Sequence, residues 1–422
     1  MENGELKTEN RKLKKYRLGE IGDIITGKTP STFDIENYGE EYMFISPTDL
    51  HNGYKIEKTL KNISQKGFDS IKTNTIKGQS VLVGCIGWDM GNVGYTEKKC
   101  ATNQQINSIT NFKEFANPLY TYYWLKNKKD FLFSVASVTR TPILNKSSFS
   151  DIVIPLPELQ NQMDVAKILS SLDDKIALNR RMNAKLEQMA KRLYDHWFVQ
   201  FDFPNADGKP YKSSGGKMEY NEVLKREIPA GWKISNVCKV ADILSGGTPS
   251  KANYNFWNGN IPFFGPTDYT GDMFQLSTAE KITQEGLDHC ASSLFDENTI
   301  IITARGSVGK LVIVGNPMAM NQSCYALKSK NRNQYEYLYF LTIQLIESLK
   351  VKSSGSVFKS IITSDIENSF LIIADSAIID SFCEKVKPLF LQIKENSKEP
   401  QKLTVLRDRL LPLLMNGQVE VK

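Results

Sequence analysis

The second half of this chain repeats the first in a single register, and this repetition limits the possible folds more than any other feature of the sequence. The residues that coincide are mostly glycine, proline, aspartate and aromatic residues, the types that mark turns and strand ends. The matched segments are Asp23-Ile24 with Asp242-Ile243, Gly27, Thr29, Pro30 and Ser31 with Gly246, Thr248, Pro249 and Ser250, Pro47-Thr48-Asp49 with Pro266-Thr267-Asp268, and, after a slip of one residue, Asn103-Gln104 with Asn321-Gln322. So many matches in one register predict two halves with the same fold.

Each half has the same order of parts, a β-rich region followed by a long helix. Buried strands are expected over 81–86 in the first half and over 299–304 and 311–314 in the second, because these are short apolar runs. Helices packed on those sheets are expected over 116–127 and 334–350. The predicted fold class is therefore α+β, an internal duplication of two β-rich domains that are each followed by a long helix.

Both long helices carry apolar residues at heptad spacing. The seam of the first helix contains Val165, Leu172, Asn179, Leu186 and Leu193, alternating with Leu169, Ile176, Asn183, Ala190 and Trp197. The seam of the second helix contains Phe382, Leu389, Asn396, Leu403 and Leu410, with Val386 and Ile393 between them. A sustained heptad predicts that the helices pair, here as an antiparallel coiled coil. The alternative is two ordinary amphipathic helices on separate cores. The matching Asn179 and Asn396 count against it, because a polar seam residue costs stability and fixes register.

Pro400 occupies the position in the second helix that Asn183 occupies in the first. Because proline removes a backbone donor and crowds the preceding turn, the second helix is expected to kink or break there.

The repeat, the heptads and a polar stretch that contains glycine, serine and proline define the expected domain boundaries. These are a basic N-terminal segment (1–17), a first β-rich domain (18–157), a first long helix (158–201), a linker (202–231), a second β-rich domain (232–374) and a second long helix (375–417).

Composition is typical of a soluble protein, with 41% hydrophobic and 24% charged residues. No apolar run reaches the roughly 20 residues of a membrane span, and the charged N-terminus lacks the apolar core of a signal peptide, so a cytoplasmic protein is expected. The net charge of +6 permits a polyanionic partner without proving one. Six cysteines without C-x-x-C spacing and three histidines predict no metal site.

Several motifs resemble those of the specificity (S) subunits of type I restriction–modification enzymes, and the resemblance covers nearly the whole chain. The resembling features are G-K-T-P-S at 27–31 and G-G-T-P-S at 246–250, each followed by an aromatic-Pro-Thr-Asp-type segment, Gly306–Gly309 leading to Asn321-Gln322, I-P-L-P-E-L-Q-N-Q at 154–162, and the stretches 186–204 and 225–233. The chain departs from the pattern at Gly87–Gly91, where the second half has the compact Gly306–Gly309, and at 372–382, which lacks the Pro-x-x-Gln (157–160) of the first helix start.

The resemblance implies that each β-rich domain is a target-recognition domain that reads one half of a split double-stranded DNA site. It implies that the helices set the unread spacer and dock two modification subunits, which bind S-adenosylmethionine and methylate adenine. Restriction subunits that cleave DNA with ATP would join that core. S-adenosylmethionine, ATP and Mg are therefore expected on partner subunits, and no cofactor is expected on this chain.

Catalytic motifs are missing from the sequence. Asn117-Pro118 faintly resembles the Asn-Pro-Pro-aromatic motif of adenine methyltransferases, but Asn before Pro is also a normal helix start. No G-x-G-x-x-G follows a predicted strand, and no G-x-x-x-x-G-K-[ST] is present. We therefore expect a non-catalytic subunit with no catalytic residues.

Three groups of residues are candidates for DNA contact. The first comprises Lys28, Thr29, Ser31, Thr248 and Ser250 in the G-x-T-P-S loops, which suit either phosphate contacts or purely structural turns. The second comprises Arg140, Thr141, Lys359 and Ser360, in two loops that align between the halves and suit phosphate or base-edge contacts, or are simply exposed basic turns. The third, the candidate base-reading residues, comprises Trp88, Asp89, Asn92, Arg305, Ser307 and Lys310.

The function favoured by these features is sequence-specific binding of bipartite DNA and scaffolding of methyltransferase and endonuclease subunits. One alternative is the recognition subunit of a related system whose methylation and cleavage activities lie in one other chain. A self-contained DNA-modifying enzyme is disfavoured by the missing motifs. A helical scaffold protein that does not bind DNA would leave the duplicated β-rich domains unexplained.

Overall fold

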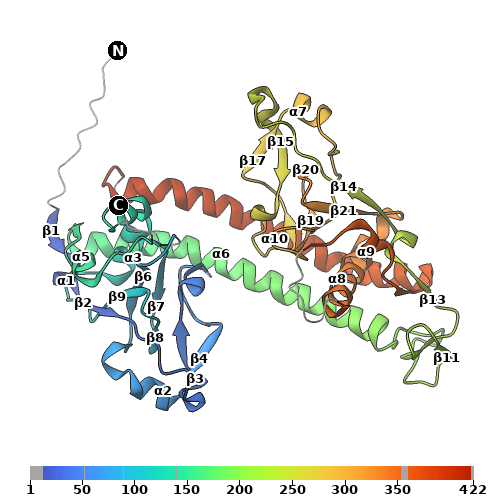
Figure 1. The fold of residues 1–422 in the computed structure, drawn as a ribbon, viewed down its shortest axis with the longest axis horizontal. Coiled ribbons are helices and arrows are strands. Elements are labelled where there is room, and N and C mark those ends of the chain that lie inside the picture. Colours follow the sequence, from blue (N-terminus) through green and yellow to red (C-terminus); the bar gives the residue numbers. More distant parts are fainter. Residues whose placement is uncertain (1–12, 52, 89, 138–140, 353–359, 420–422) are drawn as a thin grey trace. The chain divides into compact units, whose positions relative to one another are not determined.

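The computed structural model describes residues 13–51, 53–88, 90–137, 141–352 and 360–419 (Figure 1). It divides into two compact units, which are described separately below. Unit 1 comprises residues 1–177 and 402–422, and unit 2 comprises residues 178–401. Each unit therefore contains one β-rich domain and a part of each long helix.

The β-rich domain of unit 1 holds two four-stranded sheets and a two-stranded ribbon (Figure 1). The first sheet has the order β2-β9-β6-β7, from Asp23–Thr26, Ile106–Thr110, Ser80–Gly84 and Val93–Thr96. The second has the order β4-β3-β8-β5, from Lys61–Ile63, Tyr38–Ile45, Cys100–Thr102 and Thr75–Ile76. The ribbon pairs β1 (Lys14–Arg17) with β10 (Val153–Leu156). The helices are α1 (Leu18–Ile21), α2 (Gln65–Ser70), α3 (Pro118–Lys126), α4 (Lys129–Ser134) and α5 (Lys146–Ser150).

The β-rich domain of unit 2 has sheets of related topology. A five-stranded sheet has the order β14-β21-β18-β19-β16, from Ala241–Ser245, Cys324–Ser329, Ile300–Thr303, Leu311–Val314 and Phe274–Gln275. A three-stranded sheet has the order β17-β15-β20, from Glu280–Ile282, Trp257–Phe264 and Ala319–Met320. The ribbon here pairs β13 (Lys233–Ser235) with β22 (Leu371–Ile373). The helices are α7 (Gln284–Asp288), α8 (Tyr335–Lys352) and α9 (Thr363–Glu367).

Equivalent strands of the two domains share an unusual detail of pairing. β3 and β15 each pair antiparallel with one neighbour and parallel with the other. Both strands also carry an irregularity in register at the same place, between Tyr38 and Tyr42 in β3 and between Trp257 and Ile261 in β15. The mixed α and β structure with long helices, and the strands and covering helices expected from the sequence, are confirmed by the structure.

Each domain has its main hydrophobic core between the first sheet and the covering helix. In unit 1, Tyr120 and Tyr123 of α3 pack with Val81 and Val83 of β6. In unit 2, Leu338 and Leu341 of α8 occupy the same cluster as Ile300 of β18. These residues are at most 2% exposed, so the apolar strand runs form the cores that their sequence predicted.

The first long helix is α6 (Leu159–Tyr194), which ends in a π-helical turn at Asp195–Val199, and the second is α10 (Ser376–Met415). All the heptad residues discussed above are buried or half-buried. In unit 2, Asn179 Nδ2 donates to Glu399 Oε2 at 2.8 Å, and Asn183 Nδ2 donates to Ser397 Oγ at 3.0 Å. Further along α6, the Tyr194 ring lies 5.8 Å from that of Phe382. Within unit 2, later residues of α6 therefore contact earlier residues of α10.

Helix α10 continues through Pro400, so the expected break at this residue is wrong. Pro400 is buried, as are Ile393 and Ser397 on the turns before it. A proline inside a helix costs about 3 kcal/mol. Burial of the surrounding helix face offsets that cost, because each large apolar side chain contributes about 1.5–3 kcal/mol.

The segment 202–231, expected to be a polar linker, is ordered and partly buried. It contains the hairpin of β11 (Met218–Asn221) and β12 (Arg226–Pro229). The Phe203 ring stacks on Tyr211 at 4.6 Å and on Trp232 at 5.0 Å. Phe203 and Trp232 belong to the main hydrophobic cluster of unit 2, with Tyr211 packed against it, although the surrounding sequence is polar.

Candidate nucleic-acid interface

The G-x-T-P-S loop meets the Asn-Gln loop in both units. The Thr29 hydroxyl donates to Gln104 Oε1 at 2.8 Å, and the Thr248 hydroxyl makes the equivalent bond to Gln322. A Cβ at Gly27 would lie 2.1 Å from the carbonyl oxygen of Asn103, and one at Gly246 would lie 2.1 Å from that of Asn321. Glycine is therefore needed for the close approach of two backbones. We call this contact the clasp; it gives the two most recognisable motifs a structural role.

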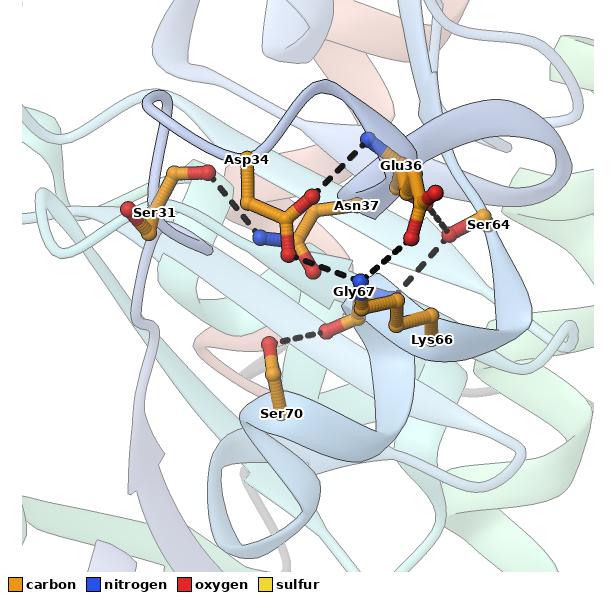
Figure 2. Close-up of polar contacts among 8 residues, drawn as sticks. All are labelled: Ser31, Asp34, Glu36, Asn37, Ser64, Lys66, Gly67 and Ser70. Atoms are coloured by element: carbon orange, nitrogen blue, oxygen red, sulfur yellow. Dashed lines mark hydrogen bonds and ion pairs between the residues drawn. The ribbon is translucent and has the colours of Figure 1, made fainter.

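In unit 1 the chain after the clasp forms a turn that is held by a dense set of polar contacts (Figure 2). Asn37 Nδ2 donates to the carbonyl oxygen of Ser31 at 3.0 Å. Asp34 accepts from the backbone N–H of Glu36 at 3.2 Å, and Lys66 forms ion pairs with both Asp34 and Glu36. The Lys66 ammonium lowers the pKa of Asp34, and the two carboxylates raise the pKa of Lys66. These groups are exposed, so the ion pairs orient the turn more than they stabilise it.

Helix α2 is fixed to the same turn. Ser64 caps the helix by accepting from the Gly67 N–H at 3.1 Å, and its hydroxyl donates to the carbonyl oxygen of Glu36 (Figure 2). A Cβ at Gly67 would lie 2.0 Å from the carbonyl oxygen of Asn37. The side chains of Lys28 and Ser31 remain exposed on this rigid segment.

Unit 2 repeats this arrangement with different side chains. Asn253 accepts from the N–H of Asn255, and Thr283 caps α7 and donates to the carbonyl oxygen of Asn255 at 2.8 Å. Trp257 Nε1 donates to the carbonyl oxygen of Ser250 at 3.1 Å. The Ser250 side chain is exposed. The turn geometry is thus common to both units, whereas the ion pairs of Lys66 belong to unit 1.

The unit 1 candidates for base contact lie on a glycine turn. Trp88 is 73% exposed, and its ring lies 6.0 Å from that of Phe133. The Asn92 side chain accepts from Lys129 Nζ at 2.9 Å and lies 3.3 Å from His51 Nε2. Asp89 lies outside the described residues. Sequence reasoning missed Lys129 and His51 in this group, because only the tertiary fold brings them to Asn92.

The unit 2 candidates lie on the equivalent turn. Arg305, Ser307 and Lys310 are all exposed. The Thr303 hydroxyl donates to the Ser307 carbonyl oxygen and accepts from the Lys310 N–H at 3.0 Å, which closes the turn. Lys310 Nζ lies 5.4 Å from the Tyr269 ring centre, in cation–π contact. Tyr269 is a further residue that sequence reasoning missed.

In each unit the glycine turn lies beside the second candidate loop. The Gly87 N–H donates to the Pro142 carbonyl oxygen at 3.0 Å, and Thr141 beside it is exposed. In unit 2, Arg305 forms a β-bridge with the exposed Ser360. Arg140 and Lys359 fall outside the described residues. The glycine turn and this adjoining loop together form the candidate recognition face of each unit: 87–88 and 90–92 with 141–143 in unit 1, and 305–310 with 360–361 in unit 2.

Three buried cysteines and the grouping of metal-binding side chains bear on catalysis and metal binding in the described part of the chain. Burial raises the pKa of the Cys85, Cys100 and Cys324 thiols to about 12, so they are not poised as nucleophiles. Among the described residues, no three His, Cys, Asp or Glu side chains are grouped to hold a metal ion. None of the described helices is both long and apolar enough to cross a membrane. Asn117 caps α3 by accepting from the Tyr120 N–H at 2.9 Å, which confirms its interpretation as a helix start.

Comparison with known proteins places these features in one family. The family model described as "Type I restriction modification DNA specificity domain" matches the chain twice, over residues 10–188 and 229–376. The chain is 27% identical over 415 residues to the type I restriction enzyme MjaIX specificity subunit of Methanocaldococcus jannaschii, covering 96% of this chain and 93% of that protein. It is 24% identical to the HindI specificity subunit of Haemophilus influenzae, covering 96% and 99%. The crystal structure of a type I S subunit from M. genitalium shares the fold, with a TM-score of 0.57, 17% identity and 96% of both chains covered.

Proposed function

Because the chain belongs to the type I restriction modification DNA specificity family, we propose that it is the sequence-specific DNA-binding subunit of a type I restriction–modification complex. It reads a bipartite double-stranded site and carries no catalytic activity itself. One observation carries this proposal furthest: each unit presents a recognition face of the same construction, with different exposed side chains.

The two recognition faces suit two different half-sites. The exposed indole of Trp88 offers a stacking surface in unit 1, whereas the Asn92 amide is held by Lys129 and His51. Unit 2 offers the cations of Arg305 and Lys310 with the hydroxyl of Ser307, which suit guanine edges and phosphates. We assign contacts with the DNA backbone to the exposed side chains of Lys28, Thr141 and Ser360. The Thr29 and Thr248 hydroxyls bond within the clasp instead.

The long helices act as the spacer between the half-sites and as the scaffold for partner subunits. We infer an antiparallel coiled coil that arose by internal duplication, supported by the hydrogen bonds of Asn179 and Asn183 and by the double family match. Two modification subunits and the restriction subunits would join it. S-adenosylmethionine, ATP and Mg would then be bound by those partners.

Domain exchange tests this function. Residues 232–374 are replaced by the recognition domain of a relative, and methylated sites are mapped in cells by single-molecule sequencing. We expect one half of the methylated site to change while the other half and the spacer are retained. A hybrid that methylates a site altered in both halves would contradict independent reading, and deletion of the gene provides the matched control because it should abolish methylation at the wild-type site.

A further inference from the structure

Lys310 of unit 2 and Asn92 of unit 1 occupy the same backbone position on the two recognition faces. Each follows a glycine with a positive φ angle, +77° in unit 2 and +84° in unit 1. The Lys310 carbonyl oxygen accepts from the Thr303 N–H at 2.9 Å, and the Asn92 carbonyl oxygen accepts from the Gly84 N–H at 3.0 Å. Thr303 and Gly84 correspond in the repeat. The two side chains therefore start from equivalent points, immediately before β19 and β7.

In both units a residue from the segment that continues the Pro-Thr-Asp motif contacts this side chain. In unit 1, His51 Nε2 lies 3.3 Å from the Asn92 amide nitrogen. In unit 2 the Tyr269 ring takes that place, with its centre 5.4 Å from Lys310 Nζ. Unit 1 adds Lys129, whose Nζ donates to the Asn92 amide oxygen at 2.9 Å. Each domain thus controls the orientation of the side chain at this position, but with different chemistry.

Tyr269 is a fixed support for the lysine. The Asp268 carboxylate accepts from the Gly265 N–H and from the Ala279 N–H, each at 2.8 Å, and so holds the turn that precedes the tyrosine. The Tyr269 ring is half-buried and packs against the hydrophobic cluster that contains Phe264. Because the ring is fixed, the lysine that it holds loses less side-chain freedom when its ammonium binds a ligand.

The contact with Tyr269 fixes the charge of Lys310 without using its hydrogen-bond donors. A ring face attracts a cation through its quadrupole, whereas the ammonium carries three N–H donors. Within the described part of the chain, Lys310 Nζ forms no hydrogen bond or ion pair. Lys251 differs, because its Nζ lies at the same 5.4 Å from the Trp257 ring centre but also pairs with Glu280 at 3.5 Å. Lys310 thus keeps its donors for a ligand.

We propose that Lys310 reads a guanine in the half-site of unit 2 and that Tyr269 is its positioning residue. This rests on the proposed function, under which the recognition face meets DNA. Guanine presents two acceptors, O6 and N7, at its major-groove edge, and lysine is one of the side chains that commonly bind them. A phosphate attracts a lysine in many orientations, so an ammonium held over one ring favours a base edge.

The test uses the full-length chain assembled with its modification subunits. Single-molecule sequencing maps the methylated site, and exchange of residues 232–374 identifies the half that unit 2 reads. Affinity is then titrated for duplexes that carry 7-deazaguanine, in which a C–H replaces the N7 acceptor, at single positions of that half. At one position we expect binding to weaken about fivefold, because one of the two acceptors for lysine is lost. The Lys310→Met variant should show no loss at that position.

The positioning role of Tyr269 has its own readout. Tyr269→Leu removes the ring and should lower the 7-deazaguanine penalty at that position from about fivefold to about twofold, because the ammonium is no longer held in place. Tyr269→Phe keeps the ring and should retain the full penalty. A merely structural role would instead weaken binding of all duplexes alike and leave the penalty unchanged.

Lys251 provides the matched control, because it makes the same ring contact in the same unit. Lys251→Met should leave the penalty intact. A half-site of unit 2 without guanine, or one in which 7-deazaguanine causes no loss at any position, would overturn the proposal. A Lys310→Met complex that retains the penalty but binds DNA with a flatter salt dependence would assign Lys310 to a phosphate instead. These results leave the proposed function intact, whereas an assembled wild-type complex that neither binds nor methylates a defined site would contradict that function itself.

Discussion

The β-rich domain of unit 1 is joined to the long helices by buried polar groups, whereas unit 2 uses aromatic rings at the equivalent positions. In unit 1, Asp173 of α6 accepts from the Tyr123 hydroxyl at 2.8 Å and from Arg407 Nη1 at 2.5 Å. The Asp173 and Arg407 side chains are only 5% and 14% exposed. The positions that correspond to Tyr123, Asp173 and Arg407 in unit 2 are Phe340, Phe390 and Ala190.

Phe340 and Phe390 form part of an aromatic cluster in unit 2. Their rings lie 5.9 Å apart, and the Tyr194 ring lies 5.2 Å from that of Phe340. Both phenylalanines and Ala190 are fully buried or nearly so. One architecture therefore accepts either an ion pair or apolar rings at the same junction. A buried ion pair requires closely placed and well-oriented groups, because their mutual attraction must offset the desolvation of both charges. The unit 1 junction thus depends on the ion pair, and the unit 2 junction depends on apolar packing together with the hydrogen bond from the Tyr339 hydroxyl to Glu187 Oε1 at 2.9 Å.

Truncation of the unit 2 cluster should have the largest effect. We expect Phe390→Ala to destabilise unit 2 by about 3–5 kcal/mol, because it removes a buried ring and leaves a cavity. Hydrogen exchange measured peptide by peptide would show faster opening in unit 2 than in unit 1. Phe390→Leu is the conservative control and should cost less. Equal loss of protection in both units would contradict separate junctions.

Removal of Asp173 should have the next largest effect, on unit 1. Asp173→Ala leaves the Arg407 guanidinium and the Tyr123 hydroxyl without their shared acceptor, which we expect to cost about 3 kcal/mol. Arg407 keeps its contact with Asp408, which limits the loss. The triple variant Tyr123→Phe, Asp173→Phe, Arg407→Ala places the side chains of the unit 2 junction in unit 1 and should recover most of the lost stability in thermal unfolding. A triple variant less stable than Asp173→Ala would show that the two junctions are not interchangeable.

The pH dependence of the units should differ because of Glu336, whose equivalent in unit 1 is Leu119. Glu336 is 1% exposed, its Oε2 atom has no hydrogen-bond partner, and burial raises its pKa to about 7. The folded protein therefore holds this proton more tightly than the unfolded chain. Its contribution to stability is present below about pH 4.5 and is lost as pH rises toward 7 and above, by on the order of 2 kcal/mol.

Hydrogen exchange at several pH values, corrected for intrinsic rates, measures this difference. Unit 2 should open more readily at pH 8 than at pH 5, and Glu336→Gln should remove most of the change. Leu119→Gln in unit 1 is a control for substitution at the equivalent site. An unchanged pH profile in Glu336→Gln would place the titrating group elsewhere.

The smallest expected effect concerns the caps of the two rigid turns. Ser64→Ala and Thr283→Ala each remove a helix cap, which typically costs about 1 kcal/mol, and the two losses should be similar because the caps are equivalent. Thermal unfolding of the single and double variants would measure them. Additive losses would confirm that the turns are independent, and a strongly non-additive double variant would show coupling.

The sequence predicted those features that depend on local patterns. The strand β6 and the cap at Asn117 followed from an apolar run and an Asn-Pro pair, since both signals lie within a few residues. The local order of segment 202–231 could not be foreseen, because Phe203, Tyr211 and Trp232, which pack together there, lie far apart in the sequence. Asp173 was beyond prediction for a similar reason, because its partners Tyr123 and Arg407 lie 50 and 234 residues away along the chain.

In the candidate site too, the sequence predicted local features but not the contacts between distant segments. The sequence identified polar and aromatic residues of the glycine turns as candidate base readers, but it could not show that each turn lies against its second loop. It left the G-x-T-P-S hydroxyls open between phosphate contact and structure. In the clasp, Thr29 and Thr248 bond to Gln104 and Gln322. These partners lie far away in the sequence, so no local sequence pattern could predict the contacts.

The clasp has a consequence for how such a protein diverges. Its glycines, threonines and glutamines are the same in both units, while the side chains on the glycine turns have little in common. The residues that close each domain are thus separate from those that face outward. Substitutions of the exposed side chains on the outward turns leave the hydrogen bonds of the clasp in place, so these surfaces can change while each domain stays closed.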